Sequence, residues 1–376
     1  MKETFAAGRE ITALRRKLHQ AAELSGRERN TARIIAGYLG RQKPDELITG
    51  LGGFGLAAVY NGARPGKTVL LRAELDALPI KDEISAPYRS FSNAAHKCGH
   101  DGHAAAVCAV ARALKIEPLA RGRAVLLFQP AEETLAGAKA VLADKKFKNF
   151  MPDRVFALHN FPGFELGSVI LKAGVMCRAT AGIIMEFAGR VSHASEPEKG
   201  LNPAGALAEI ILAVRSHPHA IPGAKLTVVG VNAGGPYFGT SPGSGTLMLT
   251  ARAETQAGLV RLVKKCERTA AAVSGKHGLK LRLAVTDACP ETRNSPCAVK
   301  LVRRAAEAAG LKTAELRNSF PTAEDFGCFT AAISGALAGI GSGKKQPPLH
   351  SPRYDYPDRL LTPSARLLET VLRGSV

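Results

Sequence analysis

Tryptophan is absent from this chain of 376 residues, and aromatic side chains make up only 5% of it. Proteins that bind single-stranded nucleic acids stack bases on aromatic side chains, so stacking surfaces of that kind are scarce here. No apolar run reaches the ~20 residues needed to cross a bilayer. The first residues, to about Leu24, form a mixed-charge helical pattern without the apolar stretch of a signal peptide. We therefore expect neither a nucleic acid nor a membrane as a partner.

Disulfide-bonded scaffolds are also disfavoured. The seven cysteines are odd in number and scattered through a long chain. Proteins with this cysteine usage usually work in a reducing compartment. The sequence predicts a cytoplasmic protein.

Acidic residues are few in relation to basic ones. Asp and Glu number 32 against 51 Lys and Arg, which gives a formal net charge of +19. A nucleic-acid-binding protein can have this balance, but the basic residues occur only in short groups such as Lys264 and Lys265. We interpret them as a solvated basic surface. Electrostatic steering of anionic substrates is a further interpretation.

The hydrophobic pattern predicts an α/β fold. Apolar runs at 68–74, 123–129 and 154–159 are typical of strands covered on both faces, and helical patterns at 102–114 and 136–144 lie between them. Strands that alternate with helices favour a mainly parallel sheet with helices on both faces. We assign residues 1–178 and 291–376 to this catalytic domain.

Residues 179–290 have a different order of elements. A strand is followed by a helix that Asn202 caps, with Pro203 at its first position. Two strands, a second helix and a last strand complete a βαββαβ order, which is typical of a ferredoxin-like α+β domain. We expect this domain to be inserted into the first. The expected strands are 183–187, 225–231, 246–252 and 280–285, and the expected helices run from Asn202 to about His217 and over 256–277.

Polar side chains follow the expected strands of the catalytic domain. Asp76, the pair Glu132 and Glu133, His159 and His350 each lie at or just after a separate apolar run. Ligands of open α/β sheets bind beyond the carboxyl ends of the strands. Four strands that deliver such residues to one edge favour a functional site over isolated structural residues.

The segment HKCGHDGH adds the ligand types that zinc and similar ions prefer. Cys98 lies just before a helix, where the helix N-terminus favours its thiolate. Alternatives are a catalytic cysteine and a closed structural zinc site, and we rank both lower because carboxylates lie close to the histidines. We place Asp101 and His103 behind the ligands.

Glu132 and Glu133 are adjacent, so their side chains leave the strand in different directions. One carboxylate can bind metal while the other takes a proton from a metal-activated water and passes it to the leaving amine. The sequence alone does not divide these roles between them.

These segments together resemble the aminoacylase/carboxypeptidase-type metallopeptidases, and most of all the branch of hippurate hydrolase, N-acetyl-diaminopimelate deacetylase and plant auxin-conjugate hydrolases. The resemblance implies a general base, Glu132, and an acidic residue that supports a metal ligand, Asp76. The implied ligands of two metal ions are Cys98, His100, Glu133, His159 and His350. The motifs that carry the resemblance are LRRKLHQAAEL, LLRAELDALPI, HKCGHDGHAA, LLFQPAEETLAGAKAVL, ALHNFPGFELGSV, GRVSHASEPEKGLNP, EDFGCF and LHSPRYDYPD.

The resemblance also implies roles for the inserted domain. His193 matches a residue that stabilises the oxyanion and grips the substrate across a dimer interface, and Arg252 matches a position that holds a substrate carboxylate. Two positions depart from the family. Gly239 stands where an Asn is usual, which puts the substrate in doubt, and Glu74 stands where Asp is commoner.

The sequence as a whole predicts a metal-dependent amidohydrolase that cleaves N-acyl-amino acids or similar small amides bearing a carboxylate. It would use two divalent ions, zinc or manganese, with cobalt or nickel as further options. The resemblance implies a homodimer through the inserted domain. One alternative is the same metal site acting on another C–N bond, in an aryl amine or at a peptide end. Another is a basic anion- or nucleic-acid-binding protein on a hydrolase scaffold.

Overall fold

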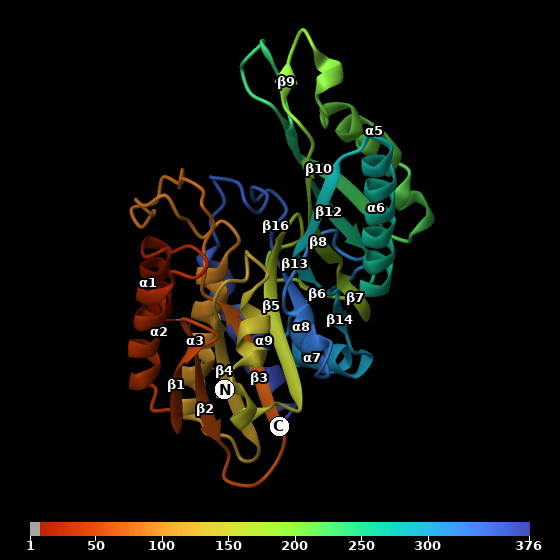
Figure 1. Cartoon of the computed structure of the whole chain (residues 1–376). Helices are drawn as coiled ribbons and strands as arrows, with labels where there is room; N and C mark the ends of the chain where they lie inside the picture. The colour runs from red at the N-terminus through yellow and green to blue at the C-terminus, as the bar shows by residue number, and fades with distance from the viewer. Residues whose placement is uncertain (1–7) are drawn as a thin grey trace. The chain divides into compact units, whose positions relative to one another are not determined.

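The computed structural model describes residues 8–376 and divides the chain into two compact units (Figure 1). Unit 1 contains the chain up to Met176 together with Thr292–Asn318 and Asp325–Val376. Unit 2 contains Cys177–Glu291 and the short segment Ser319–Glu324. We propose the domain boundaries expected from the sequence, with residues 1–178 and 291–376 in the catalytic domain and 179–290 in the inserted domain. Residues 319–324 are added to the inserted domain.

Unit 1 is built on one eight-stranded sheet. Across the sheet the strands are β1 (Glu46–Leu51), β2 (Gly55–Asn61), β4 (Arg123–Gln129), β3 (Thr68–Glu74), β5 (Arg154–Pro162), β16 (Gly335–Gly343), β6 (Val169–Leu171) and β15 (Thr313–Glu315). The pairs β3–β4, β3–β5, β5–β16 and β6–β15 are parallel. The other three pairs are antiparallel. The mainly parallel sheet predicted from the sequence is confirmed.

Helices cover both faces of this sheet. One face, to which Val69 and Leu71 of β3 belong, shares a buried apolar core with the longer helices. Arg72, which follows Leu71 in the strand, turns to the other face and contacts Asp325, which also accepts a hydrogen bond from the backbone of Ala138. The longer helices are α1 (Arg9–Gln20), α2 (Arg29–Arg41), α3 (His100–Ile116), α7 (Pro296–Ala308) and α9 (Leu361–Arg373), and α4 (Gly137–Ala143) and α8 (Gly327–Thr330) are shorter. A two-stranded ribbon of β7 (Gly174–Cys177) and β14 (Thr292–Asn294) completes the strands of unit 1.

Unit 2 has the predicted βαββαβ order. Its elements are β8 (Ala179–Ala188), α5 (Ala204–Val214), β10 (Lys225–Ala233), β12 (Ser244–Ala253), α6 (Gln256–Lys276) and β13 (Lys280–Cys289). The sheet order is β10-β12-β8-β13, and every pair is antiparallel. This is the ferredoxin-like arrangement. A small ribbon pairs β9 (Ser192–His193) with β11 (Thr240–Ser241).

Two of the differences from the sequence analysis have a clear physical reason. The helix expected to run from Asn202 to about His217 ends at Val214, and a separate 3-10 turn follows at His217–Ala220. Pro218 accounts for the break, because it lacks a backbone N–H and its ring clashes with a continuing helix. The strand Glu46–Leu51 was not anticipated, because most of its residues are exposed and it lacks the apolar pattern of a buried strand.

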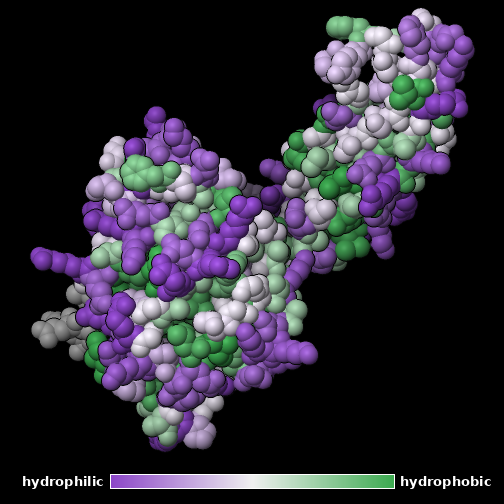
Figure 2. Space-filling model, turned by 60° about the vertical axis from the view of Figure 1, so that its left-hand side comes forward, coloured by the Kyte–Doolittle hydropathy of each residue, from purple (hydrophilic) through white to green (hydrophobic). Residues whose placement is uncertain are grey.

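On the visible face of unit 1, hydrophilic side chains are spread widely and apolar patches lie between them (Figure 2). Among the helices that the structure describes, none has both the length and the apolar character that a membrane crossing requires.

Candidate metal centre

The turn before α3 brings Cys98 and His100 close together. Gly99 lies between them with φ 91°, in the left-handed region that favours glycine. A Cβ at this position would also lie 2.1 Å from Oδ1 of Asn160. Glycine therefore meets both the conformational and the steric requirement of this turn. Cys98 and His100 are both buried.

The imidazole of His100 is anchored on one side only. Its Nδ1 donates a hydrogen bond of 2.9 Å to the backbone carbonyl of Asp76. Its buried Nε2 has no hydrogen-bond partner among residues 8–376 and lies 3.8 Å from a carboxylate oxygen of each of Glu132 and Glu133. An anchored imidazole whose second nitrogen faces carboxylates is the usual arrangement of a metal-binding histidine.

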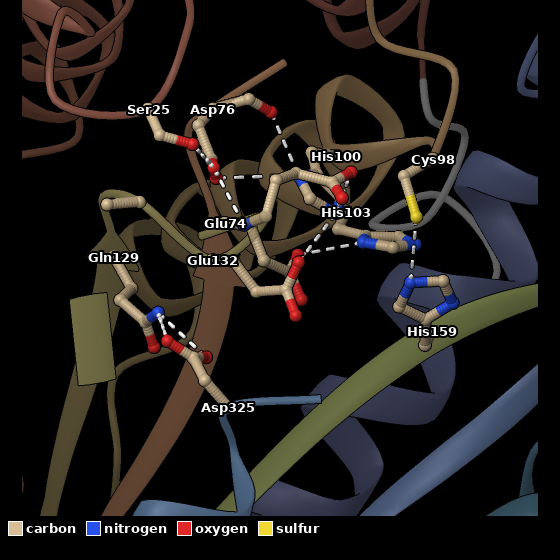
Figure 3. A network of polar contacts seen from close by, with 12 residues as sticks. Ser25, Glu74, Asp76, Cys98, His100, His103, Gln129, Glu132, His159 and Asp325 are labelled. Atoms are coloured by element: carbon tan, nitrogen blue, oxygen red, sulfur yellow. Dashed lines mark hydrogen bonds and ion pairs between the residues drawn. The ribbon is translucent and has the colours of Figure 1, made fainter. Parts of the chain in front are cut away.

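His159, in β5, has the same kind of anchor. Its Nδ1 donates a hydrogen bond of 2.9 Å to the carbonyl of Asn160, and its Nε2 lies 3.4 Å from Sγ of Cys98. Figure 3 shows the sulfur and this imidazole side by side. A thiolate and an imidazole at this distance are two of the ligand types that zinc prefers.

Glu133 and His350 are the last two of the predicted metal ligands. His350 Nε2 lies 3.7 Å from Glu133 Oε2, and the His350 side chain is 53% exposed. His350 has φ 65°, and Ala131, just before the glutamate pair, has φ 53°. Such left-handed conformations cost non-glycine residues roughly 1–3 kcal/mol and cluster at functional sites.

The candidate ligand atoms form overlapping groups. Within each group below, one ligand atom per residue lies within 4.8 Å of all the others. Cys98 is shared by two of the groups, so its sulfur is placed to contact two ions. The groups are Cys98 with His100 and His159, Cys98 with Glu133 and His350, and His100 with Glu132 and Glu133. The donor set and the unbonded Nε2 of His100 fit two divalent cations.

The electrostatics of the cluster favour a cation. Burial lowers the pKa of His100, but Asp76, Glu74 and Glu133 more than offset this effect and raise that pKa to about 10. Burial and nearby histidines instead lower the pKa of His159. Positive charge is thus stabilised at His100. A metal ion that replaces this proton binds more weakly as the pH falls below about 10.

Asp76 supports the cluster through its backbone and its carboxylate. Beside the carbonyl that holds His100, its Oδ2 accepts hydrogen bonds from Ser25 Oγ at 2.7 Å and from the backbone N–H of Glu133 at 2.9 Å. Burial raises the pKa of Asp76, and the contacts with His100 and Ser25 lower it below its ordinary value. The side chain is therefore charged and orients two of the predicted ligands (Figure 3).

A buried polar layer lies behind the cluster, and the sequence analysis anticipated Asp101 and His103 in it but not their partners. Nδ1 of His103 donates a hydrogen bond of 2.8 Å to Oε2 of Glu74, and its Nε2 lies 2.6 Å from Oδ1 of Asn160, which agrees with its expected place behind the ligands. Asp101 contacts the buried side chains of Arg15 and His19, both at 2.8 Å. The signal for this layer was present in the first helix, where an amphipathic pattern carries Arg15 and His19 on its buried side.

His193 and Arg252 lie in unit 2, whereas the candidate metal ligands lie in unit 1. His193 is exposed in β9, and its Nδ1 lies 2.6 Å from Ser195 Oγ. Arg252, in β12, donates a hydrogen bond of 3.1 Å to the carbonyl of Pro321. The structure brings together the other seven predicted site residues, all of them in unit 1.

Comparisons with known proteins show which family the chain is similar to. Residues 70–374 match the model of peptidase family M20/M25/M40. The chain is 30% identical to the hippurate hydrolase of Campylobacter jejuni over 362 residues, which cover 95% of this chain and 94% of that protein. It is 31% identical to the N-acetyl-L-cysteine deacetylase of Bacillus subtilis, with coverage of 89% and 80%. The fold is similar to that of the YxeP protein of Bacillus subtilis, a dinuclear metal-binding peptidase (TM-score 0.82, 23% identity, coverage 97% and 96%).

Proposed function

Because the chain belongs to peptidase family M20/M25/M40, we propose that it is a metal-dependent amidohydrolase of N-acyl-amino acids or similar small amides. The family resemblance seen in the sequence is confirmed, and so is the named branch. Two relatives are named for the hydrolysis of hippurate and the deacetylation of N-acetyl-L-cysteine, both N-acyl-amino acids. The observation that carries the proposal is the convergence of one thiol, three imidazoles and two carboxylates in unit 1.

The residues proposed to hold two divalent ions are Cys98, His100, Glu133, His159 and His350. The two groups that share Cys98 support this set. The ions, when bound, polarise the amide carbonyl and make a nearby water acidic. The thiolate and imidazoles favour zinc, whereas the carboxylates leave manganese, cobalt and nickel open.

Glu132 is the proposed general base. It is buried, and its Oε2 faces His100 Nε2 at 3.8 Å. Unlike Glu133, it is not grouped with Cys98 and His350. Glu132 would take a proton from the attacking water and pass it to the departing amine nitrogen. His193 would stabilise the oxyanion and grip the substrate, and Arg252 would hold a substrate carboxylate.

A substrate panel tests the proposal. The protein loaded with zinc or manganese should hydrolyse N-acetyl- or N-benzoyl-amino acids, and a chelator should abolish the activity until metal is restored. Product analysis identifies the bond that breaks. Hydrolysis only of aryl amines or peptide ends would favour the alternative substrate class. Salt-sensitive binding of nucleic acid without any hydrolysis would contradict the proposal.

A homodimer through unit 2 is also proposed, together with a cytoplasmic location supported by seven free cysteines. Strand β10 lies at the edge of its sheet, and Lys225 is its only charged residue. Val228, Val229 and Val231 are 40%, 58% and 52% exposed. A long, apolar edge strand pairs readily with another chain unless charge or proline protects it. A second copy of β10 is a suitable partner.

The double substitution Val229→Lys and Val231→Lys should convert the dimer into monomers of 39.6 kDa, because two charges per copy would have to be buried. Sedimentation velocity measures the change. The control is Val285→Lys on β13 at the opposite edge, where a valine is 44% exposed. This variant should stay dimeric. A monomeric wild-type protein, or dissociation of the control alone, would refute the β10 interface.

A further inference from the structure

Lys97 lies between His96 and Cys98, and its side chain is completely buried. Taking an ammonium group out of water is costly unless the charge is paired and hydrogen-bonded. Nζ of Lys97 lies 2.5 Å from Oδ1 of Asp82, whose side chain is equally buried, and donates a second bond of 2.9 Å to the carbonyl of Tyr354. Because Lys97 is completely buried, its ammonium is not exposed on the surface of the protein.

The backbone of Lys97 also bonds to the segment that contains Tyr354. Its carbonyl accepts a hydrogen bond of 2.9 Å from the backbone N–H of His350. The side chain and the backbone of one residue therefore hold the segment that contains His350 and Tyr354 against the segment that contains Cys98. His350 keeps its left-handed conformation, φ 65°, beside this tie.

The partners of Lys97 are themselves held in place. Asp82 Oδ2 contacts Nε2 of His19 and accepts from the backbone of Ser90, both at 2.9 Å. Burial raises the pKa of Asp82, and the bonds from His19 and Lys97 lower it below its ordinary value, so the carboxylate stays charged. The hydroxyl of Tyr354 accepts from Nδ2 of Asn160 at 2.7 Å. Hydrogen bonds thus connect Lys97 through Tyr354 to Asn160, the residue that follows His159.

We propose that Lys97 is a positioning residue that sets the distance between Cys98 and His350 and thereby the spacing of the two metal ions. The proposal rests on the function assigned above. It differs from a purely structural role because Lys97 precedes Cys98 in the chain and bonds the segment of His350, while Tyr354 of that segment bonds Asn160, next to His159. Partners that orient ligands from behind typically contribute ~10–100-fold to metal affinity.

The variant Lys97→Met keeps the aliphatic stem and removes the charge. Titration with Co²⁺ should show one of two ions bound ~10–100-fold more weakly, together with a changed thiolate-to-cobalt absorption band, because the sulfur of Cys98 would be repositioned. Lys115→Met is the matched control. Lys115 also donates to a backbone carbonyl, that of Arg41 at 2.9 Å, but lies at the other end of α3. It should leave affinity and spectrum unchanged.

Lys97→Met removes the ammonium that faces the buried carboxylate of Asp82 and is expected to lower stability, so the double variant Lys97→Met/Asp82→Asn is measured alongside. It removes both charges of the buried pair, and it should recover thermal stability but not the wild-type cobalt spectrum. Wild-type affinity for both ions and a wild-type band in either folded variant would overturn the proposal. A wild-type protein that binds no pair of ions would instead overturn the proposed function.

Discussion

The substitution Glu132→Gln is expected to lower kcat by ~10²–10⁴-fold while both metal ions remain bound. Glutamine keeps the shape of the side chain but cannot accept and return a proton near neutral pH. The position of Glu132 supports a loss of turnover without a loss of metal. Its carboxylate lies 3.8 Å from His100 Nε2, but it shares no ligand group with Cys98 or His350.

Two measurements are needed on this variant. Steady-state kinetics on the best substrate of the panel gives kcat and KM, and metal analysis of the same sample gives the ions bound per chain. Glu133→Gln is the matched control on the neighbouring residue. It should lose metal, because Glu133 is grouped with both His100 and His350. Normal turnover in Glu132→Gln, or loss of metal from it, would remove Glu132 from the role of general base.

The second large effect is expected from Cys98→Ala. Since the sulfur of Cys98 belongs to two ligand groups, its removal should weaken both ions, by ~100-fold or more, and abolish hydrolysis. A ligand that contacts one ion only should behave differently. His350→Ala removes a half-exposed side chain that is grouped with Cys98 and Glu133 alone, so it should weaken one ion and leave the other bound.

Calorimetric titration with zinc or manganese separates these patterns, because two sites of unequal affinity give two transitions. Cys297→Ala controls for the loss of a thiol, since Cys297 is exposed and bonded to Ser295 and Ser334 away from the cluster. It should bind both ions normally. If Cys98→Ala lost only one ion, the sulfur would not be a shared ligand.

Most of the fold could be predicted because its signals are local. The apolar runs of β3, β4 and β5 are continuous, as they must be in strands buried on both faces. The exposed edge strand β1 has no such run and was missed. The helix after Asn202 was expected to reach about His217 but ends at Val214, four residues before Pro218, because the proline cannot continue a helix.

The candidate site could be predicted in part. Residue type and position at the ends of strands singled out candidate residues, while the choice of five ligands among them and the division of roles between Glu132 and Glu133 came from a family resemblance. Lys97 and Asp82 gave no signal, because a lysine and an aspartate in polar loops look like solvated surface residues. Only their burial shows that they pair.

The amino-acid sequence by itself determined the local elements, their order and the metal-binding chemistry of the side chains, because these depend on near neighbours along the chain. The tertiary structure alone decided which atoms meet. The unbonded Nε2 of His100, the sulfur shared between two groups and the buried ammonium of Lys97 all depend on distances between segments far apart in the chain. Burial then sets their charge, since the cost of an ion is fixed by the partners that folding brings to it.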